Sequence, residues 1–302
     1  MVGTGVPLSN LVVHAAVQAF AEAIGASGAA HGLALGLWVA PPERAFFSVP
    51  TALGSGVAVI VATRARLFPA LVEAWRGLAH PRSLVTSAKA RDALAIAWIA
   101  AVSAGVGTIL ARASGGAPEG ERTIAIGLGL SGIALFAGAL VSASRDRGDA
   151  RSRGRATYEA PTWIAATLAG CAHAFGSWPG VSRVGAAASV LLALGVKPQR
   201  AMEIALVATV PFWWFEAARS AGSGASPRLG GGAIAVALFG FLGAYAAIAL
   251  WRALAAKRAL VAVSLWMIPL ACAIFAYGRA HPSRSTSSHD DAHTLRSTSD
   301  PT

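Results

Sequence analysis

The stretch Gly176-Ser-Trp-Pro-Gly-Val-Ser-Arg-Val-Gly-Ala186 interrupts a long run of apolar sequence. It contains Pro179 and Gly180, which end a helix, and it places Ser182 and Arg183 directly after the break. A broken helix and an arginine in a hydrophobic region are both costly unless they face a cavity or a ligand. The stretch therefore predicts a polar site inside an apolar fold, and phosphate is the ligand that we expect there.

The composition around this stretch is that of an integral membrane protein. The chain has 302 residues, of which 55% are hydrophobic and 13% are charged, and its mean hydropathy is +0.58. A soluble domain carries about 25% charged residues. The net charge of +11 comes from short connectors between apolar spans and forms no continuous basic face. We therefore expect membrane lipids, and no nucleic acid, as partners.

Six apolar segments are long enough to cross a membrane as helices. Two shorter pairs of apolar pieces, within 7–40 and 161–195, are each interrupted by glycine or proline and predict hairpins that enter the membrane and turn back. The connector 64–90 carries arginines and an amphipathic pattern, which predicts a separate helix at the membrane interface. The six expected spans are 46–63, 91–111, 122–143, 199–220, 230–252 and 259–278.

Basic residues in three connectors mark the cytoplasmic side of the predicted fold. With this orientation the first hairpin enters from outside and the second from inside, so the two halves of the chain have opposite topologies. We expect an all-α integral membrane protein with six transmembrane helices and two re-entrant helical hairpins in an inverted-topology repeat, a plan used by transporters. The basic connectors are 64–90, 144–160 and 252–258.

The expected organisation has two repeats, each containing one hairpin and three spans. A shift of 155 residues places Gly25 on Gly180 and Ser27 on Ser182, so the two helix breaks coincide. A tail rich in Ser, Thr, His and Asp is expected to be disordered. The segments are residues 1–143 with hairpin 7–40, the cytoplasmic connector 144–160, residues 161–278 with hairpin 161–195, and the tail 279–302.

The first hairpin carries polar residues that a membrane interior does not tolerate without a function. Gln18 and Glu22 lie four residues apart on one helix face, and a carboxylate at membrane depth is a functional candidate by default. Their oxygen atoms suit a divalent cation. His31 is a general acid or base, or a structural residue. Ser27 is a helix cap, a phosphate donor or a nucleophile.

The second hairpin offers donors for an anion. The backbone N–H groups after Gly180, including that of Val181, are candidate phosphate donors. The hydroxyl of Ser182 either caps the helix or donates to a phosphate oxygen. Arg183 adds a planar guanidinium suited to phosphate, and the alternative is that its side chain extends to the interface. Glu203, inside a later span, is expected to pair with Arg200 or Arg183, or to complete the second half of the site.

Two stretches resemble the motifs of one known family. The stretch Gln18-Ala-Phe-Ala-Glu-Ala-Ile-Gly-Ala-Ser-Gly-Ala-Ala-His31 is similar to the first motif of the undecaprenyl-diphosphate phosphatases, (E/Q)xxxE followed by a serine turn and Gly-His. The stretch Trp178-Pro-Gly-Val-Ser-Arg-Val-Gly-Ala186 is similar to their second motif, PGxSRSxxT. The resemblance extends in order over roughly residues 8–278.

The resemblance implies a hydrolase of the bacterial inner membrane. Such an enzyme converts undecaprenyl diphosphate to undecaprenyl phosphate and inorganic phosphate, which recycles the lipid carrier for peptidoglycan synthesis and is associated with bacitracin resistance and cell shape. The family requires a divalent cation, here Mg²⁺ or Ca²⁺, and its pocket opens to the periplasm. Assembly as a homodimer is left open.

The resemblance also assigns roles to individual residues of this chain. The implied catalytic residues are Glu22, Ser27, His31 and Arg183; the implied substrate-binding residues are Gly180, Val181, Ser182 and Arg183; and the implied metal ligands are Gln18 and Glu22.

Several positions depart from the family motifs. Gly25 stands where the family has proline, and Ala30 replaces the glycine before the motif histidine. Gly28, Val184 and Ala187 replace hydroxyl residues, and each hydroxyl is worth about 1–3 kcal/mol in holding an oxyanion.

The lost hydroxyls leave the nucleophile and the activity open. A mechanism that uses the second motif serine requires a substitute, either Ser27 or a metal-activated water assisted by His31. The alternatives to hydrolysis are a lipid flippase or transporter, and a catalytically inactive homologue with a scaffold role.

Overall fold

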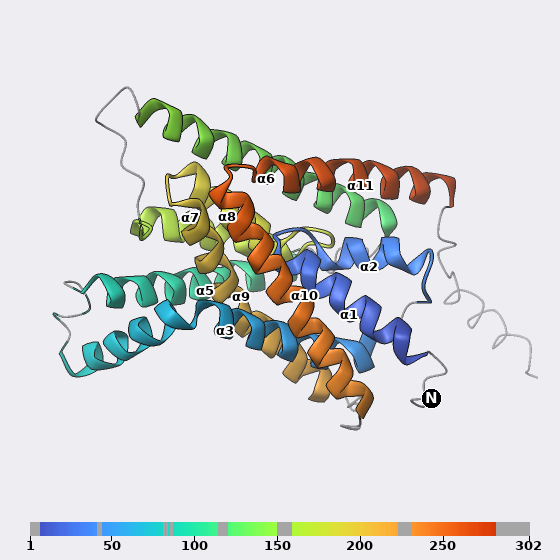
Figure 1. Cartoon of the computed structure of the whole chain (residues 1–302), viewed down its shortest axis with the longest axis horizontal. Helices are drawn as coiled ribbons and strands as arrows, with labels where there is room; N and C mark the ends of the chain where they lie inside the picture. Colours follow the sequence, from blue (N-terminus) through green and yellow to red (C-terminus); the bar gives the residue numbers. More distant parts are fainter. Residues whose placement is uncertain are drawn as a thin grey trace, which may run out of the picture.

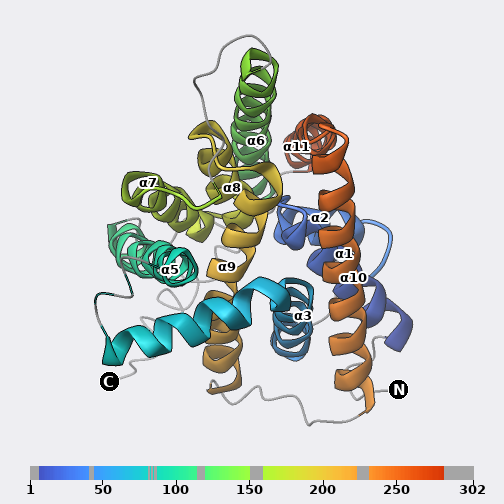
Figure 2. The same cartoon turned by 60° about the vertical axis from the view of Figure 1, so that its left-hand side comes forward.

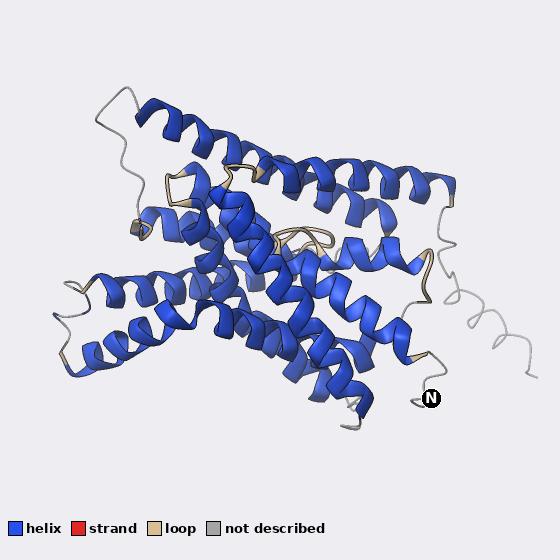
Figure 3. Ribbon diagram, viewed as in Figure 1, coloured by secondary structure: helices blue, strands red, loops and turns tan. Residues whose placement is uncertain are grey.

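The computed structural model describes residues 7–40, 44–80, 82, 84, 87–113, 120–149, 159–222 and 231–281. Over these residues the chain forms ten α-helices, one short 3-10 helix and no strand (Figure 3). Six of the helices are long and apolar enough to cross a membrane, which confirms the predicted number of spans and identifies a multi-pass helical membrane protein. They are α3 (Arg44–Ala79), α5 (Ala88–Ala113), α6 (Glu121–Asp149), α9 (Pro198–Gly222), α10 (Gly231–Ala256) and α11 (Val261–Ala280).

The predicted break between a first span and a separate interfacial helix is wrong. Helix α3 continues for 36 residues, through Pro50 and Pro69. At 1.5 Å per residue it is about 54 Å long, which exceeds the ~30 Å hydrocarbon core of a bilayer. The exposed side chains of Phe68 and Trp75 keep the amphipathic pattern within this one helix. A proline removes one backbone donor without ending a helix when the flanking turns continue around it.

Two other predicted boundaries move outward. Helix α6 continues to Asp149, inside the predicted connector 144–160, whose residues 150–158 lie outside the described ones. Helix α11 ends at Ala280, and the predicted disordered tail from residue 282 onward is likewise outside the described residues.

The long helices pack in layers around a continuous core. Helix α6 lies along α11, and α3 lies against α10, which also covers α1 (Figures 1 and 2). Helix α9 contacts α3, α5 and α8 near the middle of the molecule. Large side chains that are almost fully buried in this core include Leu128, Leu135, Leu191, Leu192, Met202, Leu206, Trp251 and Met267.

Two pairs of short helices lie where the sequence predicts the hairpins. The first consists of α1 (Leu8–Ala23) and α2 (Gly28–Gly36). The second consists of α7 (Trp163–Ala174), the 3-10 helix η1 (Phe175–Ser177) and α8 (Arg183–Ala193). Figure 1 shows the open end of the first pair on the right, near the N-terminus, and α7 entering from the left.

The turns of the two hairpins touch each other. A Cβ atom placed on Gly185, in the first turn of α8, would lie only 2.1 Å from the carbonyl oxygen of Gly25. Glycine at this position of α8 therefore lets the two backbones meet without a side chain between them.

Each turn depends on a glycine with positive φ, but the local motifs differ. At the end of α1, Gly25 (φ +84°) and Ala26 donate to the carbonyls of Glu22 and Ala21, which is a Schellman C-cap. In the second hairpin Val181 donates to the carbonyl of Trp178 across Pro179 and Gly180 (φ +83°), which is a type II turn. The Gly25 that replaces the family proline is thus required by the Schellman geometry.

A buried charge cluster ties α5, α9 and α10 together away from the hairpin turns. Arg200 is 5% exposed, pairs with Asp92 and donates to Glu203 at 3.0 Å. Glu203 also lies 3.4 Å from Arg252 and 3.7 Å from Arg66. Of the two arginines that the sequence offers as partners, Glu203 therefore pairs with Arg200. In the described part of the chain no contact links Glu203 to Arg183.

Candidate functional site

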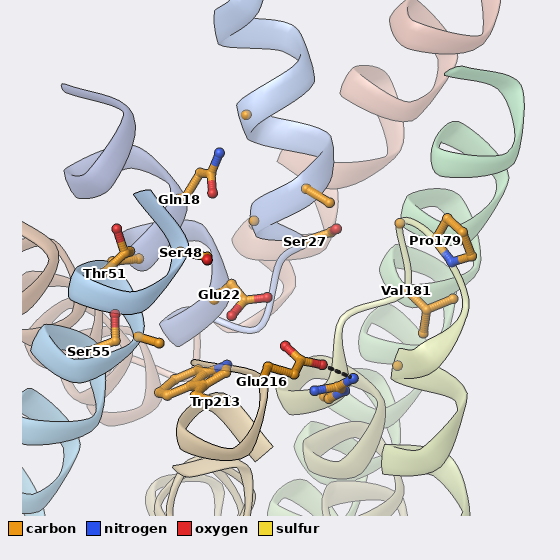
Figure 4. Close-up of a pocket in the computed structure, with 18 of the residues that line it drawn as sticks. Gln18, Glu22, Ser27, Ser48, Thr51, Ser55, Pro179, Val181, Trp213 and Glu216 are labelled. Atoms are coloured by element: carbon orange, nitrogen blue, oxygen red, sulfur yellow. Dashed lines mark hydrogen bonds and ion pairs between the residues drawn. The ribbon is translucent and has the colours of Figure 1, made fainter. Parts of the chain in front are cut away.

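A cavity of about 800 Å³ lies where the two hairpin turns meet (Figure 4). Helices α1, α2, α3, α8 and α9 and the turn before α8 all contribute to its wall. Its polar lining comprises His14, Gln18, Glu22, Ser27, Ser48, Thr51, Ser55, Ser177, Arg183, Trp213, Glu216 and Ser220.

One face of α1 supplies the predicted carboxylate and amide. His14, Gln18 and Glu22 follow at intervals of four residues, so all three line the same cavity. The Trp213 side chain lines the cavity beside Glu22 (Figure 4). Glu22 also lies within electrostatic range of Arg183, which attracts its charge.

Helix α2 packs closely against these two side chains because it presents glycines to them. A Cβ atom on Gly28 would lie 2.5 Å from Cγ of Glu22, and one on Gly32 would lie 2.3 Å from Nε2 of Gln18. Contacts this short do not occur between real atoms. Gly28, which replaces a motif serine, is therefore the residue that leaves room for the Glu22 side chain in this arrangement.

A row of hydroxyl groups on α3 faces the same cavity. Ser48, Thr51 and Ser55 lie at i, i+3 and i+7 and line the cavity (Figure 4), although the Thr51 hydroxyl donates to the Phe47 carbonyl at 2.8 Å. We missed this row in the sequence, although its helical spacing within an apolar span was a usable signal. This row adds hydroxyl groups to the cavity, whereas the two family motifs that border the cavity have lost hydroxyl residues in this chain.

Arg183 is held inside the cavity by residues of α9. Its Nη2 donates to Oε1 of Glu216 at 2.8 Å, the dashed line in Figure 4. Its guanidinium also lies 5.5 Å from the centre of the Phe212 ring. The side chain is thus directed to the cavity and does not extend to an interface. Glu216 was also missed in the sequence, because nothing in its surroundings there connects it with the second motif.

The serine of the second motif has a structural position. Ser182 is 4% exposed, its Oγ accepts the N–H of Gly185 at 3.0 Å, and its own N–H donates to Ser131 Oγ at 2.9 Å. It caps α8, one of the two roles considered from the sequence, and it does not line the cavity, where a phosphate donor was expected. The neighbouring Gly180 and Val181 do line it.

The serine and histidine of the first motif are joined through the turn. Ser27 lines the cavity, is 3% exposed, and accepts the N–H of Ala30 at 3.4 Å as the N-cap of α2. His31 Nδ1 donates to the Ser27 carbonyl at 2.8 Å, while its Nε2 accepts the indole N–H of Trp266 at 3.0 Å. His31 does not line the cavity.

The cavity therefore brings together six of the eight residues selected from the sequence. His31 and Ser182 are the two that lie outside its lining. The six that line it are Gln18, Glu22, Ser27, Gly180, Val181 and Arg183.

The oxygen ligands in the cavity suit a cation that also binds the oxygens of a phosphate group. Within the described part of the chain, no cluster of three or more His, Cys, Asp or Glu side chains could hold a metal ion alone. Gln18 and Glu22 nevertheless offer an amide oxygen and a carboxylate. Mg²⁺ is commonly bound by one or two carboxylates together with substrate phosphates. The residues fit such a shared arrangement better than an all-protein metal site.

The fold and the cavity together define a multi-pass helical membrane protein with a polar, arginine-containing cavity at two helix breaks. Residues 11–273 match the family model described as bacitracin resistance protein BacA, so the chain belongs to this family. It is the undecaprenyl-diphosphate phosphatase family that the two motifs resemble. A comparison with curated proteins gives no match.

Proposed function

We propose that the protein hydrolyses undecaprenyl diphosphate to undecaprenyl phosphate and inorganic phosphate, and so recycles the lipid carrier for cell-wall synthesis. One observation carries the proposal: Arg183 and Glu22, from different hairpins, line one cavity in a chain that belongs to the BacA family. A guanidinium and a carboxylate that share a polar cavity can bind a diphosphate and accept a proton from water.

The membrane arrangement that we propose has both hairpins re-entrant and the units 1–143 and 161–278 inverted. Helix α1, with 16 residues, is about 24 Å long and too short to cross the ~30 Å core. The hairpins open in opposite directions (Figure 1), and their turns carry positive-φ glycines and capping serines 155 residues apart. With the basic connectors in the cytoplasm of the bacterial inner membrane, the cavity opens to the periplasm.

The diphosphate is bound by groups from three elements in this proposal. Arg183 binds phosphate oxygens through its planar guanidinium, and the hydroxyls of Ser48 and Ser55 donate from the opposite wall. Backbone at Gly180 and Val181 borders the same space. The polyprenyl chain extends from the cavity into the surrounding lipid.

The formal charges of the cavity favour a divalent cation. Glu22, Glu216 and Arg183 sum to one negative charge, which repels a diphosphate. We propose that Gln18 and Glu22 hold Mg²⁺ or Ca²⁺ against the phosphate oxygens. When bound, the cation neutralises phosphate charge and makes the phosphorus more electrophilic.

Water is the nucleophile that we propose. Ser27 Oγ is buried and accepts the N–H of Ala30, so it is committed to the helix cap. The water oxygen bonds to the terminal phosphorus, the bond from that phosphorus to the bridging oxygen breaks, and the proton of the water passes to a Glu22 carboxylate oxygen. Undecaprenyl phosphate leaves. His31 holds the turn through the Ser27 carbonyl and is a positioning residue in this scheme.

The test is phosphate release from undecaprenyl diphosphate by the purified protein in detergent. We expect release that EDTA abolishes and that Arg183→Ala and Glu22→Ala each reduce by about 10²–10³-fold, as for other transition-state donors. Glu73→Ala, at an exposed pair with Arg76, is the control. No metal-dependent release, or full activity in both cavity variants, contradicts the proposal. Lipid movement across vesicles without phosphate release would support a transporter.

A further inference from the structure

The ion pair between Arg183 and Glu216 occupies the position that the proposed substrate needs. Both residues line the cavity, and Nη2 of the arginine lies 2.8 Å from Oε1 of the glutamate. A carboxylate and a phosphate present oxygen atoms to a guanidinium with similar geometry. The N–H bond of Nη2 that donates to Glu216 is therefore unavailable to a phosphate oxygen until the carboxylate moves away, which leaves fewer of the five N–H donors of the guanidinium for the substrate.

Glu216 is the partner that can move. Its side chain is 49% exposed, whereas the Arg183 side chain is 19% exposed. The arginine has a second support, because Phe212 lies under its guanidinium at 5.5 Å. Phe212 precedes Glu216 by one helical turn of α9, so the ring and the carboxylate hold the same cation from one helix face. Loss of the carboxylate leaves the ring contact in place.

We propose that Glu216 is a built-in competitor for the anion site of Arg183. The inference rests on the proposed function, since it concerns the same arginine. In the free protein the Glu216 carboxylate is paired with the Arg183 guanidinium. An entering phosphoanion displaces the carboxylate, which pairs with the arginine again when the inorganic phosphate product leaves. Glu216 thus lowers the affinity for phosphoanions and keeps the partly buried guanidinium of Arg183 paired between turnovers.

The other charged residues near Glu216 do not share its hydrogen bond with Arg183. Glu22 lines the same cavity, but the Arg183 guanidinium donates its hydrogen bond to Glu216. Arg219, one turn after Glu216 on α9, does not line the cavity. Removal of the Glu216 charge therefore frees one specific donor.

The experiment is a calorimetric titration of inorganic pyrophosphate into the full-length protein in detergent, in low salt with EDTA present. Removing the cation keeps the readout independent of turnover. We expect Glu216→Gln to bind pyrophosphate about fivefold more tightly than the unsubstituted protein, the factor that corresponds to a partly exposed ion pair. Arg183→Ala should weaken binding at least about tenfold. Glu73→Gln, at the exposed pair with Arg76, is the matched control and should change nothing.

The outcomes distinguish the two proposals. If Arg183→Ala weakens binding while Glu216→Gln leaves it unchanged or weaker, the competitor role is overturned and the phosphate site stands. If Arg183→Ala has no effect on pyrophosphate binding, both proposals fail. Glu216→Ala is the second variant, and it should also bind more tightly, because Phe212 still supports the arginine.

Discussion

The α1–α2 and α7–α8 hairpins turn in similar ways but have unequal parts in the cavity. Each turn contains a glycine with positive φ, Gly25 or Gly180, and each second helix begins behind a capping serine, Ser27 or Ser182. Only the first serine also lines the cavity. A shared turn thus fixes where the backbone reverses without fixing which side chains meet the cavity.

The cavity-facing groups lie on opposite sides of the two turns. In the first hairpin they are Gln18 and Glu22, on the helix before the turn; in the second it is Arg183, the first residue after the turn. His173, which lies 155 residues after Gln18, is fully buried between Ser103 and Thr209, with contacts of 2.7 and 2.8 Å. The first hairpin supplies oxygen donors and the second supplies one cation.

The two turn glycines should differ in their tolerance of a methyl group. In Gly180→Ala the Cβ would lie 2.0 Å from the Ile124 carbonyl oxygen, in addition to a positive-φ strain of about 1–2 kcal/mol. In Gly25→Ala the nearest atom, Cα of Gly185, is 3.3 Å away, so a small shift of the neighbouring backbone is needed in addition to the same strain. We expect Gly180→Ala to lose most of its folded protein and Gly25→Ala to show a moderate loss, measured as thermal midpoints in detergent.

Gly105→Ala is the control for this pair, because no atom lies within 4 Å of its added Cβ and its backbone is helical. Its midpoint should be unchanged or raised. Equal midpoints for Gly25→Ala and Gly180→Ala would contradict the close contact of the second turn with α6.

Restoring a family hydroxyl in the first hairpin should reduce activity. Gly28→Ser places a Cβ 2.5 Å from Cγ of Glu22, so that side chain must leave its present position. We expect phosphate release to fall by about 10²-fold, the effect of misplacing a reacting group by about 1 Å. Ala29→Ser adds a hydroxyl to the same turn at an exposed cavity position and should change the rate little. A faster Gly28→Ser enzyme would show that the motif hydroxyl matters more than the packing.

Much of the fold could be predicted because its signals are local. The lengths of the apolar segments predict six spans, and Pro179 with Gly180 marks the second turn in the sequence alone. The continuous α3 could not be predicted this way. Pro69 and the arginines before it are typical of a helix end, yet neighbouring helices and the rest of the turn keep the helix intact.

Only the cavity residues that belong to a sequence motif could be predicted. Arg183 and Glu22 followed from their motifs, whereas Glu216 meets the arginine across 33 residues of chain, and that meeting depends on how α8 packs on α9. Similarly, His31 lies one turn from cavity-lining residues, but the rotation of α2 directs its ring to Trp266. Helical spacing gives neighbours along one helix; the face that meets a cavity is set by tertiary packing.

The hydroxyl row of α3 should have the smallest effect, because each group adds one hydrogen bond from the wall opposite the hairpin turns. We expect Ser48→Ala and Ser55→Ala each to raise KM about two- to tenfold with kcat nearly unchanged, as for a hydrogen bond worth about 0.5–1.5 kcal/mol. Ser144→Ala, at an exposed position near the far end of α6, is the control in the same steady-state assay. If instead kcat fell more than about a hundredfold in Ser55→Ala, that hydroxyl would act in the chemistry. The oxygen nucleophile would then come from a long span, and the comparison between the two hairpins would concern binding alone.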